Sequence, residues 1–243
     1  MKLISLNLWG GRIYPALEAF LKKYADDVDI FCFQEIYNNA EEGMSDEERK
    51  HRPYLLTDLQ QLLPNYTFYF RPVIKTWYGI GIFVKKGVKV LEEGALEIYT
   101  QPHYDFQGGD HTRNLQWIHL QTFGNNYHIA NVHGLWTEKG KVDTPQRIIQ
   151  SEIIKKHLSS ITIPTILCGD FNLLPDTQSM KILEEHMINL IKKHHITSTR
   201  SHYYTKAEKF ADYVLVSKQI TVKDFKVLQD VVSDHLALFL EFE

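Results

Sequence analysis

Polar side chains that can bind a cation or transfer a proton stand at the ends of several short apolar runs in this sequence. Such runs resemble buried strands, which ordinarily lead into turn residues. Carboxylate and amide oxygens are ligands that Mg²⁺ prefers, and histidine changes its charge near neutral pH. The side chains concerned are Asn7, Glu35, Asn131, His133, Asp170, Asn172, Asp234 and His235.

Eleven runs predict β-strands, some alternating in character and others apolar throughout, as expected of strands covered on one face or on both. They are Lys2–Leu6, Ile30–Phe33, Tyr66–Arg71, Ile80–Lys85, Val88–Ile98, Leu115–Thr122, Tyr127–Val132, Thr165–Cys168, Tyr213–Ser217, Thr221–Val227 and Ala237–Phe242. The acidic segment Asn38–Arg49 is expected to be a solvated excursion.

Four stretches with apolar residues at helical spacing predict helices. They run from Pro15 to Tyr24, from Pro53 to Leu63, from Thr144 to Leu158 and from Thr177 to Leu190. In the third, Thr144 is the expected N-cap and Pro145 the first helical residue.

Many strands and four spaced helices within 243 residues favour one α/β domain spanning residues 1–243, with sheets sandwiched between helices. In sheets flanked by helices, functional groups gather where strand ends converge. We therefore expect the polar side chains to share one cleft, provided that the strand ends lie at the same edge.

Composition restricts the class of protein only weakly. The formal charge is −3, so the chain is not strongly basic as many nucleic-acid-binding proteins are. Binding of a polyanion would therefore depend on a local cluster of basic residues or on a bound cation. Cys32 and Cys168 lie inside apolar runs and are predicted to be reduced core residues. The apolar run Leu3–Leu8 is too short for a signal peptide, and no run approaches the roughly 20 residues of a membrane helix. A cytoplasmic protein is the expectation.

Each candidate residue also has a purely structural interpretation. Asn7 could be a turn residue that binds its own backbone, and Asp170 and Asn172 could end a strand and cap a helix. Taken alone, His133 is more typical of a satisfied core histidine. The joint occurrence of these residues favours a shared site.

Six strings occur in the order typical of the endonuclease/exonuclease/phosphatase superfamily, which the chain resembles from Asn7 to His235. They are Leu6-Asn7-Leu8-Trp9, Gln34-Glu35, Asn131-Val132-His133, Gly169-Asp170-Phe171-Asn172, Asp212-Tyr213 and Ser233-Asp234-His235. This group of metal-dependent phosphoesterases includes DNase I, abasic-site endonucleases, inositol polyphosphate phosphatases and neutral sphingomyelinases. The resemblance implies a four-layer α/β/β/α sandwich of two mixed sheets flanked by helices, with its cleft at one end.

The resemblance also implies a divalent metal, Mg²⁺ or Mn²⁺. Glu35 would be its principal ligand, Asn7 would lie beside it, and Asp234 would complete the metal or histidine environment. Some DNA-repair members carry an acidic residue two positions after the first asparagine, where this chain has Trp9. That departure leaves open whether one or two ions bind.

Catalytic roles carry over in the same way. Asp170 and Asn172 would position and activate a water molecule, and His133 and His235 would contact the scissile phosphate. Asp212 would orient His235. The implied reaction is in-line attack of water on a phosphodiester, without a covalent intermediate. Either Asp170 or His235 could be the general base.

Further residues are expected at the substrate. Asn131 and Arg113 are assigned to substrate binding, although Arg113 could instead be a surface arginine. Trp136, Tyr203 and Tyr204 could form a rim that stacks on a base or sugar, or could pack against other side chains.

The leading hypothesis is a nuclease or nucleotide-directed phosphodiesterase, whose partner is a phosphate-ester substrate and possibly nucleic acid. The alternatives are a sphingomyelinase-like lipid or sugar-phosphate phosphoesterase and a non-catalytic binding module with the same fold. The sequence shows no obligate protein partner and leaves oligomerisation open.

Overall fold

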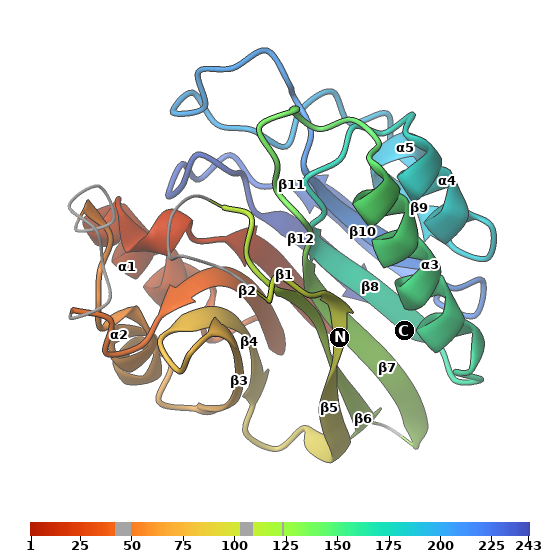
Figure 1. Ribbon diagram of the computed structural model, residues 1–243. Helices are drawn as coiled ribbons and strands as arrows, with labels where there is room; N and C mark the ends of the chain where they lie inside the picture. The colour runs from red at the N-terminus through yellow and green to blue at the C-terminus, as the bar shows by residue number, and fades with distance from the viewer. Residues whose placement is uncertain (42–49, 103–108, 123) are drawn as a thin grey trace.

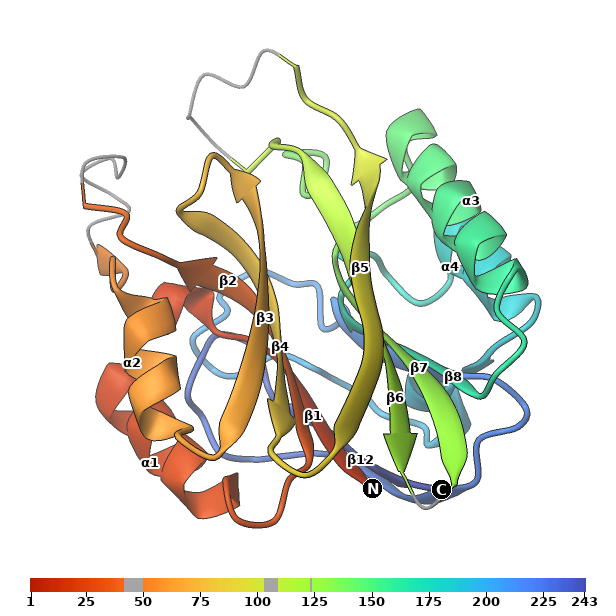
Figure 2. The same ribbon diagram turned by 90° about the horizontal axis from the view of Figure 1, so that it is seen from below.

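The computed structural model describes residues 1–41, 50–102, 109–122 and 124–243. Most of the expected excursion at Asn38–Arg49 therefore lies outside the described residues. Two six-stranded mixed sheets pack face to face, with helices on both outer faces (Figures 1 and 2). The predicted four-layer α/β/β/α sandwich is confirmed.

The first sheet comprises β1 (Lys2–Asn7), β2 (Ile30–Tyr37), β3 (Tyr66–Ile74), β4 (Tyr78–Lys85), β11 (Val222–Val227) and β12 (Leu238–Phe242), in the order β11-β12-β1-β2-β4-β3. The second comprises β5 (Lys89–Tyr99), β6 (Arg113–Thr122), β7 (Asn125–His133), β8 (Thr165–Asp170), β9 (Ile188–Asn189) and β10 (Asp212–Val216), in the order β5-β6-β7-β8-β10-β9. One parallel pair lies inside each sheet, β1 with β2 and β7 with β8.

The helices α1 (Tyr14–Tyr24) and α2 (Leu55–Leu62) cover the outer face of the first sheet. The second sheet is covered by α3 (Pro145–Ser159), α4 (Gln178–Glu184) and α5 (Leu190–Lys193). The expected cap of α3 is confirmed, because the Thr144 hydroxyl accepts a hydrogen bond from the backbone N–H of Arg147 at 3.2 Å.

Strand β2 shows why several runs are apolar throughout. Ile30 and Cys32 belong to the core between the two sheets, whereas Phe31 and Phe33 belong to the core beneath α1 and α2. Successive side chains of a strand point to opposite faces, and here both faces are buried. Cys32 and Cys168 are free, buried thiols, as expected of reduced core residues.

All eleven predicted strands overlap an observed strand, but the predicted helix from Thr177 to Leu190 is wrong. Its first half forms α4, which ends at Glu184. Asn189 then pairs with Leu215 of β10, and its side chain accepts a hydrogen bond from the N–H of Ile191 to begin α5. Strand pairing and this cap therefore override the helical pattern.

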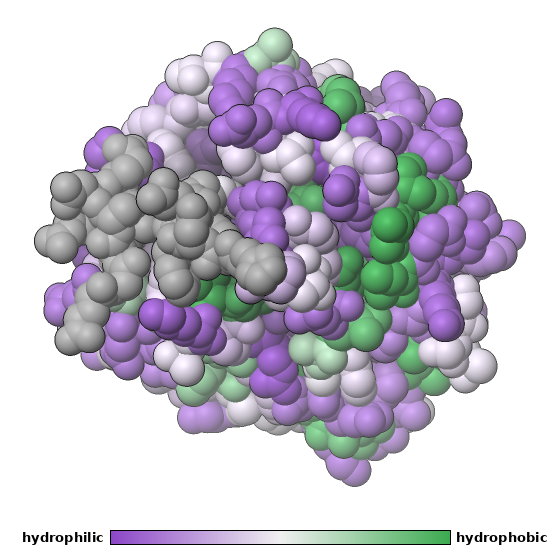
Figure 3. All heavy atoms as spheres, in the orientation of Figure 1, coloured by the Kyte–Doolittle hydropathy of each residue, from purple (hydrophilic) through white to green (hydrophobic). Residues whose placement is uncertain are grey.

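The surface in Figure 3 is mainly hydrophilic, and one group of apolar residues lies over α3, on which Ile149 is 58% exposed. In the described part of the chain, no helix has the length and apolar character needed to cross a membrane.

Candidate active site

The carboxyl ends of the two parallel pairs meet at one edge of the sandwich. Asn7 ends β1, and its amide nitrogen donates to Glu35 Oε1 and to Asp170 Oδ2, each at 3.0 Å. Its amide oxygen accepts the N–H of Trp9 at 2.9 Å. Asn7 therefore joins a carboxylate of the first sheet to a carboxylate of the second, while the bond from Trp9 fixes the orientation of its amide group.

Glu35 reaches the junction because β2 contains a bulge. The register with β4 shifts between Phe33 and Ile36, and Glu35 adopts a left-handed backbone with φ 59°. A regular strand would direct Gln34 and Glu35 to opposite faces, whereas a bulge re-aims a side chain. The prediction that the strand ends before Gln34 is wrong, since β2 continues to Tyr37.

A tight turn at the end of β8 places Asp170 and Asn172. Gly169 has φ 137°, and a Cβ there would lie 2.0 Å from the carbonyl oxygen of Val132 in β7. Asp170 Oδ1 accepts the N–H of Asn172 at 2.8 Å, and the Asn172 amide donates to the carbonyl of Gly134 at 3.1 Å. Both side chains are thus fixed in place.

His235 forms a buried pair with Asp212. Its Nδ1 lies 2.8 Å from Asp212 Oδ1, and the Thr199 hydroxyl donates to Asp212 Oδ2 at 2.9 Å. The other ring nitrogen, Nε2, lies 3.7 Å from Asp170 Oδ2. Asp212 thereby fixes the orientation of an imidazole that faces Asp170.

Surrounding charges set the pKa of this histidine. Burial and the guanidinium of Arg200 act to lower the pKa of His235. The carboxylates of Asp212, Asp234 and Asp170 act in the opposite direction and prevail, so the pKa is raised above its usual value. The three carboxylates therefore stabilise the protonated form of the His235 imidazole.

His133 has the opposite electrostatic environment. It ends β7, and its Nε2 lies 3.7 Å from Asp170 Oδ2 and 3.9 Å from Glu35 Oε1. Burial, and then the positive charge of Arg113, lower the pKa of His133 well below its usual value. His133 is accordingly a neutral hydrogen-bonding group at neutral pH.

The two carboxylates joined by Asn7 also differ. Burial raises the pKa of Glu35, and the charges of Asp234 and Asp170 add to this effect. Burial alone would also raise the pKa of Asp170, but His235, Lys141 and other cationic groups hold it below its usual value. Nearby negative charges thus destabilise ionised Glu35, and a bound cation would relieve this repulsion.

Among the described residues, two sets of side chains in this site could hold a metal ion. Asp170, Asp212 and His235 offer ligand atoms within 4.8 Å of one another, but Asp212 and His235 already bind each other. Glu35 and the nearby Asp234 offer oxygens alone, which are the ligands that Mg²⁺ prefers. The chemistry of this second donor set fits a hard divalent cation.

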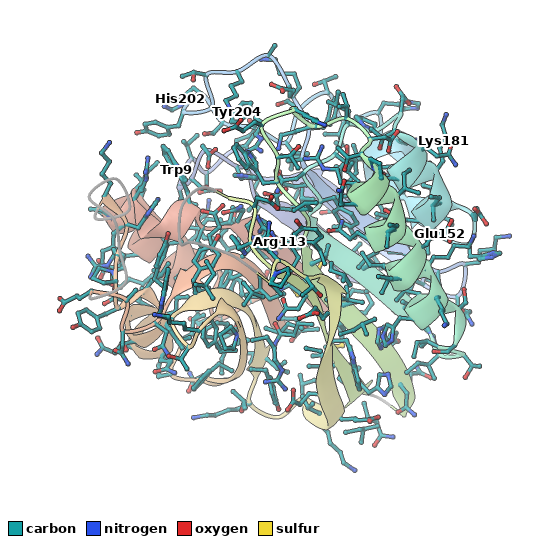
Figure 4. All side chains as sticks on the ribbon, in the orientation of Figure 1. Trp9, Arg113, Glu152, Lys181, His202 and Tyr204 are labelled. Carbon is teal, nitrogen blue, oxygen red and sulfur yellow. The ribbon has the colours of Figure 1, made fainter. Side chains whose placement is uncertain are left out.

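A cavity of about 980 Å³ opens over these side chains. Of the candidate residues from the sequence, those that line it are Glu35, Arg113, His133, Asp170, Asn172, Asp234 and His235. Asn7 and Asp212 lie buried behind them. The expected rim aromatics Trp136, Tyr203 and Tyr204 also line the cavity, as does Trp9, whose position beside the loop bearing Tyr204 is seen in Figure 4.

Asn131 does not reach the cavity. It is fully buried, its oxygen accepts from the Gln34 amide at 2.7 Å, and its nitrogen donates to the carbonyls of Phe33 and Gly81. These bonds connect the two sheets, so the geometry gives no support to the expected contact with substrate.

The sequence matches the Endonuclease/Exonuclease/phosphatase family over residues 4–235. The chain belongs to this family. No curated protein matches the sequence.

Solved structures share the fold across the whole chain. A family protein from Bacteroides thetaiotaomicron has a TM-score of 0.77 at 20% identity, covering 100% of this chain and 97% of that one. The mannosyl-6-phosphatase Bt3783 of the same species has a TM-score of 0.76 at 18% identity, covering 100% and 99%. TDP2 of D. rerio, complexed with single strand DNA product, has a TM-score of 0.75 at 16% identity, covering 100% and 98%.

Two buried cationic side chains of the cavity, Lys141 and Arg200, were not among the residues predicted from the sequence of this family member. Lys141 is buried and donates to Asn172 Oδ1 at 2.8 Å, and burial lowers its pKa to about 8. Arg200 contacts His235 Nε2 and lies 3.1 Å from Asp234 Oδ2. Neither residue follows an apolar run. In the sequence, only their positive charge could have indicated a site, and this charge is common to the many lysine and arginine residues on the surface.

Proposed function

We propose that the protein uses a divalent metal ion to hydrolyse a phosphodiester bond in a nucleotide or a nucleic acid. The observation that carries this proposal is the continuous set of contacts from Glu35 through Asn7 and Asp170 to His235 and Asp212. It combines oxygen ligands, a proton acceptor and an oriented imidazole in one cavity.

Within this proposal, Asp170 accepts the proton of the attacking water; its lowered pKa means that the carboxylate is ionised and able to act as an acceptor. Asn172 and neutral His133 donate hydrogen bonds to phosphate oxygens, and protonated His235 neutralises developing charge there. Asp212 holds His235 in the required orientation. These positions allow one displacement by water, without a covalent intermediate.

We assign the metal, Mg²⁺ or Mn²⁺, to Glu35, with Asn7 beside it and Asp234 at its margin. When bound, such an ion polarises the phosphate and offsets its negative charge. The mutual repulsion among Glu35, Asp234 and Asp170 supports a cation at this place.

The aromatic side chains at the rim of the cavity favour a substrate that carries a planar group. Trp9, Trp136 and Tyr203 line the cavity, and the ring centroids of Trp9 and Tyr203 lie 6.1 Å apart. Aromatic side chains stack on nucleobases irrespective of sequence. TDP2, which has this fold, was solved with a DNA product, and that observation favours a nucleic-acid or nucleotide substrate.

A sugar phosphate is the second candidate. Bt3783, a mannosyl-6-phosphatase, shares the fold over the full chain. The same aromatic rings could stack on the apolar face of a sugar, so substrate assays must decide between the two.

A substrate panel with Mg²⁺, Mn²⁺ or EDTA tests the proposal. It contains bis-p-nitrophenyl phosphate, plasmid and single-stranded DNA, RNA, a nucleoside monophosphate, mannose 6-phosphate and sphingomyelin. We expect metal-dependent release from a nucleotide substrate, abolished by EDTA and by Asp170→Asn. Turnover of mannose 6-phosphate or sphingomyelin alone would refute the preferred substrate class. Failure on every ester with both metals would refute the enzymatic proposal.

A further inference from the structure

Arg200 is held opposite His235 by backbone pairing. The two residues face each other in an isolated antiparallel bridge, and the N–H of Ser201 donates to the carbonyl of Asp234 at 3.0 Å. Residues directly opposite in an antiparallel pair direct their side chains to the same side. The bridge therefore aims the Arg200 guanidinium at the imidazole that faces Asp170.

The Arg200 side chain is almost completely buried, with 5% of it exposed. Its Nη1 donates to Asp234 Oδ2 at 3.1 Å and contacts His235 Nε2, and its guanidinium carbon lies 4.0 Å from the ring centroid of Tyr204. The ion pair and the aromatic face fix the guanidinium plane.

The guanidinium retains donors that the protein does not use. Its Nε is buried without a hydrogen-bond partner, and across the described ranges no residue accepts a hydrogen bond from Nη2. Arg200 nevertheless lines the cavity. Because an unpaired donor on a buried cation is costly, this arrangement suits an anionic ligand that enters the cavity.

We propose that Arg200 is a phosphate-binding residue of the reaction, donating from Nη2 to a nonbridging oxygen of the scissile phosphate. This inference rests on the proposed phosphoesterase function. The phosphate must lie near Asp170 and His235 for water to attack it, and Nη1 of Arg200 already contacts His235 Nε2. A planar guanidinium fits phosphate oxygens better than an ammonium does.

The competing explanation is that Arg200 only neutralises Asp234. Three variants separate the two, namely Arg200→Gln, Arg200→Lys and Arg200→Ala. If Arg200 binds phosphate, Arg200→Gln lowers kcat/KM on the order of 10²-fold. Arg200→Lys has a higher kcat/KM than Arg200→Gln but a lower one than the wild type, because lysine lacks the planar set of N–H donors. Added ethylguanidinium raises the rate of Arg200→Ala saturably. Inorganic phosphate mimics the phosphate group of the product. It should inhibit Arg200→Gln at least about 10-fold more weakly than the wild type.

Arg71→Gln is the matched control, since Arg71 forms an ion pair with Glu93 at the edge of the first sheet, outside the cavity lining. It should leave kcat/KM unchanged. Thermal unfolding identifies variants that fail to fold. If Arg200→Gln is among them, Arg200→Lys, which keeps the charge beside Asp234, carries the test.

Activity of Arg200→Gln or Arg200→Lys within about twofold of the wild type, with unaltered phosphate inhibition, would overturn the inference and leave the proposed function standing. If the wild type hydrolyses no ester, the proposed function fails instead. Direct titration with inorganic phosphate then still tests Arg200, and equal affinity of the wild type and Arg200→Gln would refute its role.

Discussion

Replacement of His128 by phenylalanine tests whether one buried histidine controls the acid stability of this fold. His128 lies on β7 with no exposed surface, and its ring centroid lies 5.0 Å from that of His119 and 5.4 Å from that of His157. Neither of its ring nitrogens has a hydrogen-bond partner within the described part of the chain. The protonated ring is therefore strongly disfavoured.

The pKa gives the expected magnitude. Burial, followed by the charges of His119 and His157, lowers the pKa of His128 from 6.5 to about 3. The unfolded chain takes up this proton near pH 6.5, whereas the folded chain resists it down to about pH 3. The contribution of neutral His128 to the free energy of unfolding is therefore fully present above pH 6.5. As the pH falls below 6.5, this contribution decreases by about 1.4 kcal/mol per pH unit. At pH 5.0 the loss is about 2 kcal/mol.

The assay is urea unfolding followed by tryptophan fluorescence at pH 7.5 and pH 5.0. Between these values, the wild type should lose about 2 kcal/mol more unfolding free energy than His128→Phe, because phenylalanine binds no proton. His186→Phe removes an exposed histidine on the surface and should leave the wild-type pH dependence unchanged. Parallel pH dependences for the wild type and His128→Phe would refute the reasoning.

Three further predictions concern the site and its supports. Asp212→Asn should lower kcat about 10²- to 10³-fold with little change in Tm, and should lower the pKa of His235, which a profile of kcat against pH measures. Gly169→Ala should destabilise the fold by about 3 kcal/mol or more, since its φ is 137° and its Cβ would overlap the Val132 carbonyl; denaturant unfolding checks this, and an unchanged midpoint would contradict it. Thr144→Ala should cost about 1 kcal/mol through loss of the α3 cap, seen as a lower urea midpoint, whereas Thr144→Ser should restore it.

Much of the fold and of the candidate site could be predicted from local sequence. The apolar runs revealed the strands because both faces of strands such as β2 are buried, and the Thr144-Pro145 pair marked the beginning of α3 because its cap is local. Polar residues directly after these runs, such as Asp170, reach the cavity because the ends of neighbouring parallel strands lie at one edge.

Only the tertiary structure decided the remaining features. The bulge that turns Glu35 towards Asp170 depends on the register of β2 against β4, and Arg200 reaches His235 because its segment pairs with residues far along the chain. Asn131 bonds across the two sheets instead of facing the cavity. In each case the position of a side chain is set by its pairing partner, and sequence patterns within one segment carry no information about that partner.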